Sequence, residues 1–169
     1  MLHKNTILIA STVPVIQGGM QWVGYAELAS AVSNAGGLGI LTALTQPTPE
    51  DLRKEIRRCK SMTKNPFGVN ITFLPSLSPP DYNAYADVAI REGVRIVETA
   101  GNNPGPIIAK LKAVGTVILH KCTTVKHAQS AVKLGVDFLS VDWPVYYSPI
   151  LPRSYFLHGL TILLIPISF

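Results

Sequence analysis

The chain has 169 residues, of which 47% are hydrophobic and 15% are charged, a composition that excludes a disordered protein and indicates an ordered globular chain. The net charge is +5, but the basic residues are spread over expected helix faces without interleaved aromatic residues, so no nucleic-acid partner is predicted. The length falls short of the roughly 250 residues that a complete eight-fold β/α barrel needs.

The cysteines and the apolar segments restrict the expected compartment. Cys59 and Cys122 have no metal-ligand spacing and are too few for a disulfide framework, so we expect no metal site and a reducing, cytoplasmic compartment. The apolar run at residues 6–10 is too short for a secretory signal. The apolar C-terminal stretch is shorter than the roughly 20 residues that cross a bilayer and contains Pro166, so no membrane span is predicted.

Residues 14–42 form a predicted β-α-β unit around which the rest of the chain is organised. A short strand at Val15 and Ile16 leads into the turn Gln17-Gly18-Gly19-Met20, where two residues without Cβ atoms allow a flat ligand to approach the backbone. A helix over 25–35 is predicted next, followed by a buried strand over 38–41. The helix's apolar residues recur at helical spacing and are Leu28, Ala29, Ala31, Val32 and Ala35.

The alternation of strands and helices continues along most of the chain. Further strands are predicted at 67–73, 94–100, 117–122 and 138–142. Helices are predicted from Pro49, with Leu52, Ile56 and Cys59 as its buried stripe, and over 82–92, 106–114 and 124–134. Strands that recur about every 20 to 30 residues, with helices between them, indicate parallel pairing through right-handed crossovers. Six such strands imply either a barrel or a doubly wound sheet.

Polar groups at the strand ends favour the barrel over the doubly wound sheet. The glycines at 18–19 and 36–39 fit the dinucleotide-binding fingerprint poorly. Instead, nearly every strand ends on a different polar group. An active site built from the carboxyl ends of many strands, at the mouth of the barrel, is typical of barrel enzymes. These ends are Gln17 to Met20, Thr42, Asn70, residues 98–103, residues 120–121 and Asp142.

Two of these polar residues leave alternatives open. Asn70 lies inside an apolar strand, so its amide must find hydrogen-bond partners either in the core or in a ligand, and we weight the two equally. His120 could be a polar group at the mouth, although a packed histidine at a strand end is the favoured interpretation. His127 is expected to be exposed on its helix.

The motifs QGGM, SNAGGLGILTAL, KNPFGVN, VETAGNNP and LHKCTT, read in this order, resemble the nitronate monooxygenase family, formerly called 2-nitropropane dioxygenases. The resemblance covers about residues 14–142, and the flavin-dependent enoyl-ACP reductases are similar more distantly. It implies a β/α barrel with one non-covalent FMN at the carboxyl ends of the strands. Family members oxidise alkyl nitronates with O2, through a reduced flavin, to carbonyl compounds and nitrite.

The resemblance also implies which residues line the FMN. Gly18, Gly19 and Met20, which follow Gln17, match the family's glycine turn against the flavin ring. The other cofactor-binding positions implied by the resemblance are Thr42, Asn70 and Lys121. A lysine near the pyrimidine end of the flavin would stabilise the negative charge of the reduced ring.

The sequence departs from the family after its sixth strand. The family's Ala-Gly-His element, whose histidine acts near the flavin, is absent, so no catalytic residue is assigned; His158 lies in an apolar tail and is a poor substitute. We therefore expect an α/β fold, an incomplete TIM (β/α) barrel of about six parallel β/α units, over residues 1–142. Residues 143–169 are expected to be a divergent tail, either from a truncated or altered reading frame or refolded to cover the open edge.

Three functions remain open at this stage. The leading one is an FMN-dependent nitronate monooxygenase-like enzyme, truncated and with impaired or absent activity, whose partners are a nitronate and O2. The second is a non-catalytic half-barrel that self-associates through its open edges. The third is an enoyl-ACP reductase-like enzyme, which would need a nicotinamide donor and an acyl-carrier pocket.

Overall fold

A computed structural model describes residues 11–74, 77–141, 160–161 and 164–166. Its main sheet has the strand order β2-β3-β4-β5-β6-β8, in which β2 to β6 pair in parallel and β8 pairs antiparallel with β6. The strands are β1 (Ile16–Gln17), β2 (Gly39–Thr42), β3 (Phe67–Phe73), β4 (Ile96–Gly101), β5 (Val117–Cys122), β6 (Phe138–Val141), β7 (Leu160–Thr161) and β8 (Leu164–Pro166).

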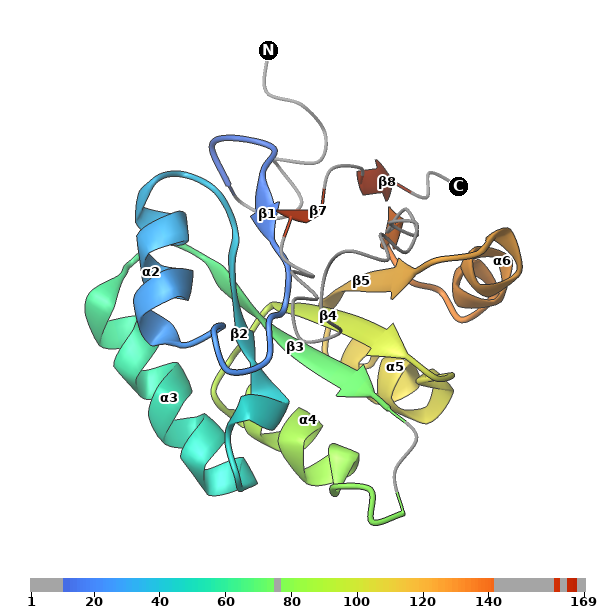
Figure 1. Ribbon diagram of the computed structural model, residues 1–169, viewed down its shortest axis with the longest axis horizontal. Helices are drawn as coiled ribbons and strands as arrows, with labels where there is room; N and C mark the ends of the chain where they lie inside the picture. The colour runs from blue at the N-terminus through green and yellow to red at the C-terminus, as the bar shows by residue number, and fades with distance from the viewer. Residues whose placement is uncertain (1–10, 75–76, 142–159, 162–163, 167–169) are drawn as a thin grey trace, which may run out of the picture.

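The first strand joins the sheet through the residue before β2. Ile16 and Leu38 form a parallel bridge, in which the Gln17 N–H donates to the Leu38 carbonyl at 3.0 Å. On its other side β1 pairs antiparallel with β7 (Figure 1). The two short C-terminal strands thus lie beside β1 and β6. Residue 142 and residues 143–159, with His158, lie outside the described residues.

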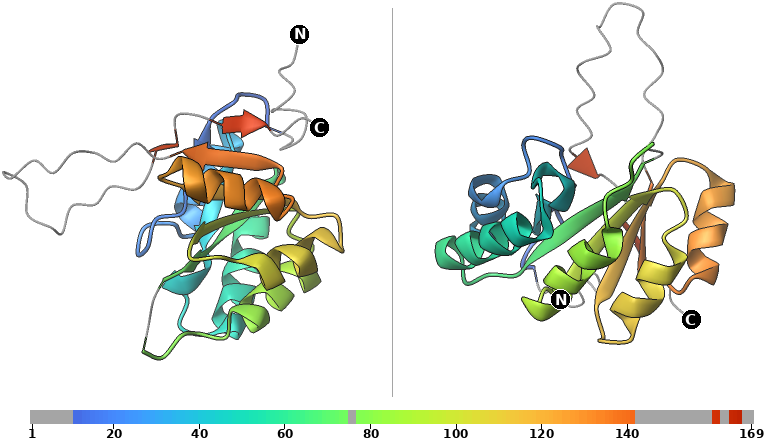
Figure 2. Two further views of the ribbon diagram at one scale, coloured as in Figure 1. Left: turned by 90° about the vertical axis from the view of Figure 1, so that its right-hand side faces the viewer. Right: turned by 90° about the horizontal axis from the view of Figure 1, so that it is seen from below.

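The helices cover the outer face of the sheet one after another, as Figure 2 shows. They are α2 (Ala26–Asn34), α3 (Pro49–Met62), α4 (Tyr82–Arg91), α5 (Gly105–Lys112) and α6 (Val125–Lys133), with the short 3-10 helix η1 (Ala43–Thr45) after β2. Each lies between two parallel strands in the sequence, as right-handed crossovers require. This arrangement confirms the predicted α/β fold with its parallel strands. None of the helices in the described part is long and apolar enough to cross a membrane.

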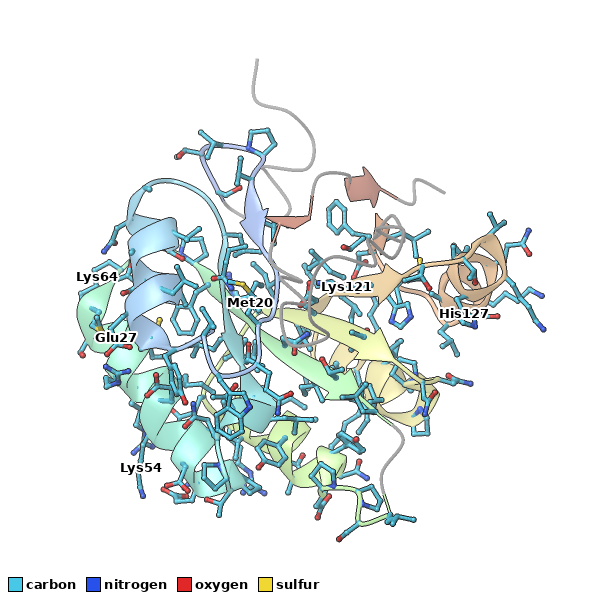
Figure 3. All side chains as sticks on the ribbon, viewed as in Figure 1. Met20, Glu27, Lys54, Lys64, Lys121 and His127 are labelled. Carbon is cyan, nitrogen blue, oxygen red and sulfur yellow. The ribbon has the colours of Figure 1, made fainter. Side chains whose placement is uncertain are left out.

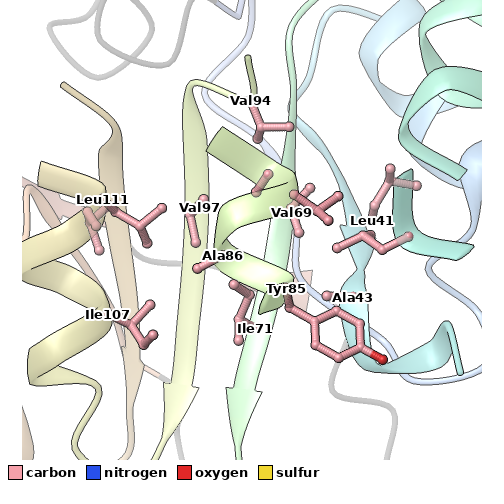
Figure 4. Packing of buried hydrophobic residues seen from close by; sticks show 14 of the residues in the cluster. Leu41, Ala43, Val69, Ile71, Tyr85, Ala86, Val94, Val97, Ile107 and Leu111 are labelled. Atoms are coloured by element: carbon pink, nitrogen blue, oxygen red, sulfur yellow. The ribbon is translucent and has the colours of Figure 1, made fainter. Parts of the chain in front are cut away.

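The core has two layers, one on each face of the sheet. The outer layer packs the helices onto the strands; Figure 4 shows Tyr85 and Ala86 against Val69, Ile71 and Val97. The inner layer fills the curved face of the sheet and consists of Ile16, Leu38, Ile40, Ile96, Leu119 and Phe138. Because both faces are covered, the strands are apolar without alternation, as parallel sheets usually are.

The predicted buried stripe of α3 is confirmed, whereas the face of α2 differs from the apolar spacing seen in the sequence. Leu52, Ile56 and Cys59 are fully buried. In α2 the buried residues are Ala26, Ala29, Ser30 and Ser33, while Ala31 and Ala35 are exposed. The backbone of α2 lies too close to β2 for larger side chains, and the Gly39 N–H donates to Ser33 Oγ at 3.2 Å.

The amino end of α2 is held by a buried carboxylate on α3. Glu55 Oε1 accepts the Ala26 N–H at 2.7 Å, and Arg58 pairs with the same carboxylate at 2.8 Å. An acceptor at a helix amino end satisfies a donor that has no partner within the helix. Glu55 therefore couples α2 to α3.

Glu55→Ala is expected to lower the free energy of unfolding by about 2 kcal/mol, because it leaves the buried Ala26 N–H without its acceptor. Urea unfolding followed by circular dichroism measures the loss. Glu50→Gln on the same helix is the control, since its side chain is 56% exposed and pairs only with Arg53 among the described residues. A loss no larger than that of the control would contradict the coupling.

Candidate functional site

The alternation of side chains along the strands creates a polar layer above the inner apolar layer. Residues two positions apart lie on one face of a strand. The residues that follow the inner core positions Ile40, Ile96, Leu119 and Phe138 by two are therefore also on the inner face, toward the carboxyl ends. They are Thr42, Glu98, Lys121 and Ser140, and Asn70 is their counterpart on β3.

The pairing register brings these residues together. Thr42 is paired with Asn70, and Asn70 is paired with Glu98, so the three lie in one row across β2, β3 and β4. Lys121 is paired with Ala100, two residues further along β4, and its side chain reaches back toward Glu98. The carboxyl ends of neighbouring strands thus form one cluster, as in the mouth of a β/α barrel.

Glu98 connects the cluster. Its Oε2 accepts the Gly19 backbone N–H at 2.8 Å and the Asn70 Nδ2–H at 2.7 Å. Its Oε1 lies 3.8 Å from Lys121 Nζ and is buried without a hydrogen-bond partner among the described residues. The side chain of Glu98 is 1% exposed and that of Lys121 is 11% exposed. A buried carboxylate of this kind needs the charge and the donors that surround it.

The glycine turn is fixed by side chains of the neighbouring strands. Thr42 Oγ1 accepts the Met20 N–H at 2.9 Å and donates to the Met20 carbonyl at 3.0 Å. The Gln17 amide bridges to β2, accepting the Ile40 N–H at 3.0 Å and donating to the Ile40 carbonyl at 3.2 Å. It also donates to the Gly18 carbonyl at 2.5 Å. Thr42 and Gln17 therefore determine the shape of the turn.

Asn70 explains why residue 19 is glycine. A Cβ atom on Gly19 would lie 2.5 Å from Asn70 Cβ, 2.7 Å from Nδ2 and closer still to Cγ. The amide of Asn70 is fully oriented, because its oxygen also accepts from Thr72 Oγ1 at 2.9 Å. Of the two interpretations of Asn70, hydrogen bonding within the protein is observed; contact with a ligand remains a proposal.

Figure 3 shows how the labelled side chains are distributed. Met20 and Lys121 lie toward the middle of the molecule, over the strands, whereas Glu27, Lys54 and His127 lie at its periphery on the helices. Lys121 is therefore part of the strand-end cluster and not of the basic outer surface. Two surface hollows in the described part lie at the opposite, amino ends of the strands, beside residues 33–37 and 64–67, away from this cluster.

His120 points to the other face of β5. It is buried on the helix-covered side, where Thr99 Oγ1 and His120 Nδ1 are hydrogen-bonded at 2.9 Å. Burial, and to a smaller extent the nearby His127, lowers the pKa of His120 below its ordinary value. His120 is thus the packed histidine that was favoured, and it does not face the mouth.

The structure brings the predicted residues Gln17, Gly18, Gly19, Met20, Thr42, Asn70 and Lys121 to one end of the sheet. Sequence reasoning counted Glu98 among the polar strand ends but did not assign it to the cofactor site, although a single acid in the apolar run of β4 was a visible signal. Among the described residues no three His, Cys, Asp or Glu side chains are grouped so as to hold a metal ion.

Comparison with known proteins identifies the family of this chain. A family model described as nitronate monooxygenase matches residues 4–144. A Mycobacterium tuberculosis protein named (3aS,4S,5R,7aS)-5-hydroxy-7a-methyl-1-oxo-octahydro-1H-indene-4-carboxyl-CoA dehydrogenase is 40% identical over 137 residues, which cover 81% of this chain and 37% of that protein. The nitronate monooxygenase of Pseudomonas aeruginosa is 42% identical over 71 residues, 42% of this chain and 20% of that protein.

A solved structure shows the same fold. FabK from Thermotoga maritima superimposes with a TM-score of 0.74 and 36% sequence identity, covering 82% of this chain and 43% of that one. The chain thus spans less than half the length of these relatives. The match of the family model over most of the sequence, together with the barrel-type strand order, leads to one conclusion. The chain belongs to the nitronate monooxygenase family.

Proposed function

We propose that the chain binds one FMN non-covalently at the carboxyl ends of its strands and acts as an oxidoreductase on alkyl nitronates, with O2 as the acceptor and carbonyl compounds and nitrite as products. The observation that carries the proposal is the cluster of Gly19, Asn70, Glu98 and Lys121, which combines a close-packed turn, oriented amides and a cation. Ligands of β/α barrels bind at this end.

The residues present fit the chemistry of a flavin. The buried Glu98 Oε1 has no hydrogen-bond donor among the described residues, and the pyrimidine ring of a flavin carries an N–H of the required kind. The ammonium of Lys121, 3.8 Å from that oxygen, would stabilise negative charge on the same ring. When bound, FMN supplies the redox chemistry that no side chain can provide.

The other predicted residues have supporting roles in this proposal. Thr42 and Gln17 hold the turn in its observed shape, so the backbone of Gly18, Gly19 and Met20 is rigid before a ligand arrives. Rigid elements around a site reduce the entropy lost on binding. The proposed substrate is the nitronate anion itself, because it needs no proton abstraction by a positioned base.

One observation favours a second candidate. The Mycobacterium tuberculosis relative, whose alignment covers 81% of this chain, is named as a dehydrogenase of a carboxyl-CoA compound. Oxidoreduction of an acyl thioester, in line with the resemblance to enoyl-ACP reductases, is therefore the alternative for the same proposed flavin site. A nicotinamide-dependent reaction on an acyl thioester, without nitrite formation from nitronates, would favour it.

Titration of the purified chain with FMN, followed by flavin fluorescence, tests the cofactor proposal. We expect saturable one-to-one binding and a dissociation constant at least about tenfold higher in Lys121→Met, because the cation at the strand ends is lost. Lys54→Met is the matched control, since the Lys54 side chain is 71% exposed on α3 and pairs with Asp51. The control is expected to bind FMN like the unchanged chain.

The outcomes separate the proposed functions. Nitrite release from an alkyl nitronate by the FMN-loaded chain supports the full proposal. A folded chain that does not bind FMN contradicts it. If that chain also dimerises with increasing concentration, the non-catalytic half-barrel replaces the enzyme, and sedimentation velocity distinguishes this case.

A further inference from the structure

Glu98 is the residue through which the separate parts of the cluster are connected. Its carboxylate, on β4, contacts the turn after β1 through the Gly19 N–H, β3 through Asn70, and β5 through Lys121. The contacts join positions up to 79 residues apart in the sequence. Glu27, Glu55 and Glu92 instead pair with arginines of α3, on the helix side of the sheet.

We propose that Glu98 has two further roles in the flavin site: it holds Gly19 and Asn70 in place, and it offsets part of the positive charge of Lys121. This inference rests on the proposed function, because it assigns the charge balance of the site to one residue. Glu98 thereby limits how strongly the site favours the reduced, negatively charged flavin over the oxidised one.

The electrostatic part follows from distance and burial. A carboxylate 3.8 Å from the Lys121 ammonium, with both groups removed from water, lowers the positive potential that the lysine exerts on a neighbouring ligand. Exposed pairs at this distance matter little because solvent screens them, but the Glu98 side chain is 1% exposed. A neutral glutamine in place of the carboxylate would therefore leave the lysine charge more fully available.

The positioning part follows from the hydrogen bonds. One oxygen, Oε2, accepts both the Gly19 N–H and the Asn70 amide, so the turn and β3 are held at one point. Hydrogen bonds to a charged acceptor are stronger than those to a neutral one. Removing the charge while keeping the shape should loosen the turn without creating a cavity.

The test compares the dissociation constants of reduced and oxidised FMN, which also follow from the midpoint potentials of bound and free flavin. Glu98→Gln is expected to increase the preference for reduced FMN roughly tenfold. It is also expected to speed hydrogen exchange of the Gly19 amide in the flavin-free chain. Glu50→Gln, the same chemical change at an exposed helix position, should alter neither quantity.

If Glu98→Gln does not fold because the Lys121 charge then lacks the compensating Glu98 carboxylate, a second pair of variants without the lysine charge provides the test. Lys121→Met and the double variant Lys121→Met/Glu98→Gln both lack the cation and differ only in the Glu98 charge. The double variant is expected to prefer reduced FMN more strongly than Lys121→Met does.

The outcomes distinguish the proposed role of Glu98 from the proposed flavin-dependent function. An unchanged preference in both pairs, in a chain that binds FMN, overturns the role of Glu98 and leaves the proposed function standing. A chain that is folded and binds no FMN overturns both. An increased preference with an unchanged Gly19 exchange rate retains the charge effect and overturns the positioning role.

Discussion

Gly39→Ala is expected to lower the free energy of unfolding by at least about 3 kcal/mol. A Cβ atom at this position would lie 2.5 Å from the carbonyl carbon of Ala29 and 2.6 Å from its Cα, and closer still to its oxygen. These are backbone atoms in the middle of α2, so no side chain can rotate out of the way. Thermal and urea unfolding followed by circular dichroism measure the effect.

The neighbouring contacts prevent α2 from moving aside. Its amino end is tied to α3 by Glu55, and Ser33 accepts the Gly39 N–H. Gly105→Ala is the matched control, because a Cβ there would meet Asn103 Oδ1 at 3.3 Å at the first turn of α5. We expect the control to change stability by less than about 1 kcal/mol. A Gly39→Ala protein as stable as the control would show that α2 does not pack on β2 as described.

Local patterns in the sequence were sufficient to predict the strands and helices between residues 14 and 141 and their parallel pairing, but not the short antiparallel strands β7 and β8. The strands predicted at 67–73 and 117–122 have the same bounds in the structure. The ends of most helices differ from the predicted ends by one or two residues. Glycine and proline mark nearly every boundary, and apolar runs identify strands covered on both faces. Parallel order then follows from the length of each crossover.

The polar connections of the site could be predicted only in part. Thr42, Asn70 and Lys121 stood out because each is polar at the end of an apolar strand, and the family motifs supported them. The contact between Gly19 and Glu98 depends on two residues that are 79 positions apart, and no local spacing encodes it. The same holds for Glu55 at the amino end of α2.

The alternation of side chains along β5 predicts which face of the sheet His120 lies on. Leu119 belongs to the inner core layer, and Lys121 two residues later lies on the same face. His120 between them must therefore point to the helices, where it meets Thr99. Applying the period of two to each strand end would have placed His120 on the helix side and Glu98 on the same face as Lys121.

Gly19→Ala is expected to disrupt the proposed flavin site, with FMN affinity falling at least about tenfold and the free energy of unfolding by about 2 kcal/mol. The added methyl group would overlap the Asn70 side chain, at 2.5 Å from its Cβ and 2.7 Å from its Nδ2. To remove this overlap, the turn must move away from β3, and this movement breaks the 2.8 Å hydrogen bond from the Gly19 N–H to Glu98. FMN fluorescence titration and urea unfolding measure the two effects separately.

A double-mutant cycle with Asn70→Gly identifies the cause. Only glycine at position 70 removes the Cβ that the new methyl group would meet, so alanine would not suffice. We expect Gly19→Ala to cost at least about 1 kcal/mol less in the Asn70→Gly background than in the unchanged chain, because the two sites are in contact. Additive losses would mean that residue 19 is glycine for another reason, such as direct contact of its backbone with the flavin. In that case stability would be nearly unchanged in Gly19→Ala while FMN affinity alone decreased, and the two measurements together would show it.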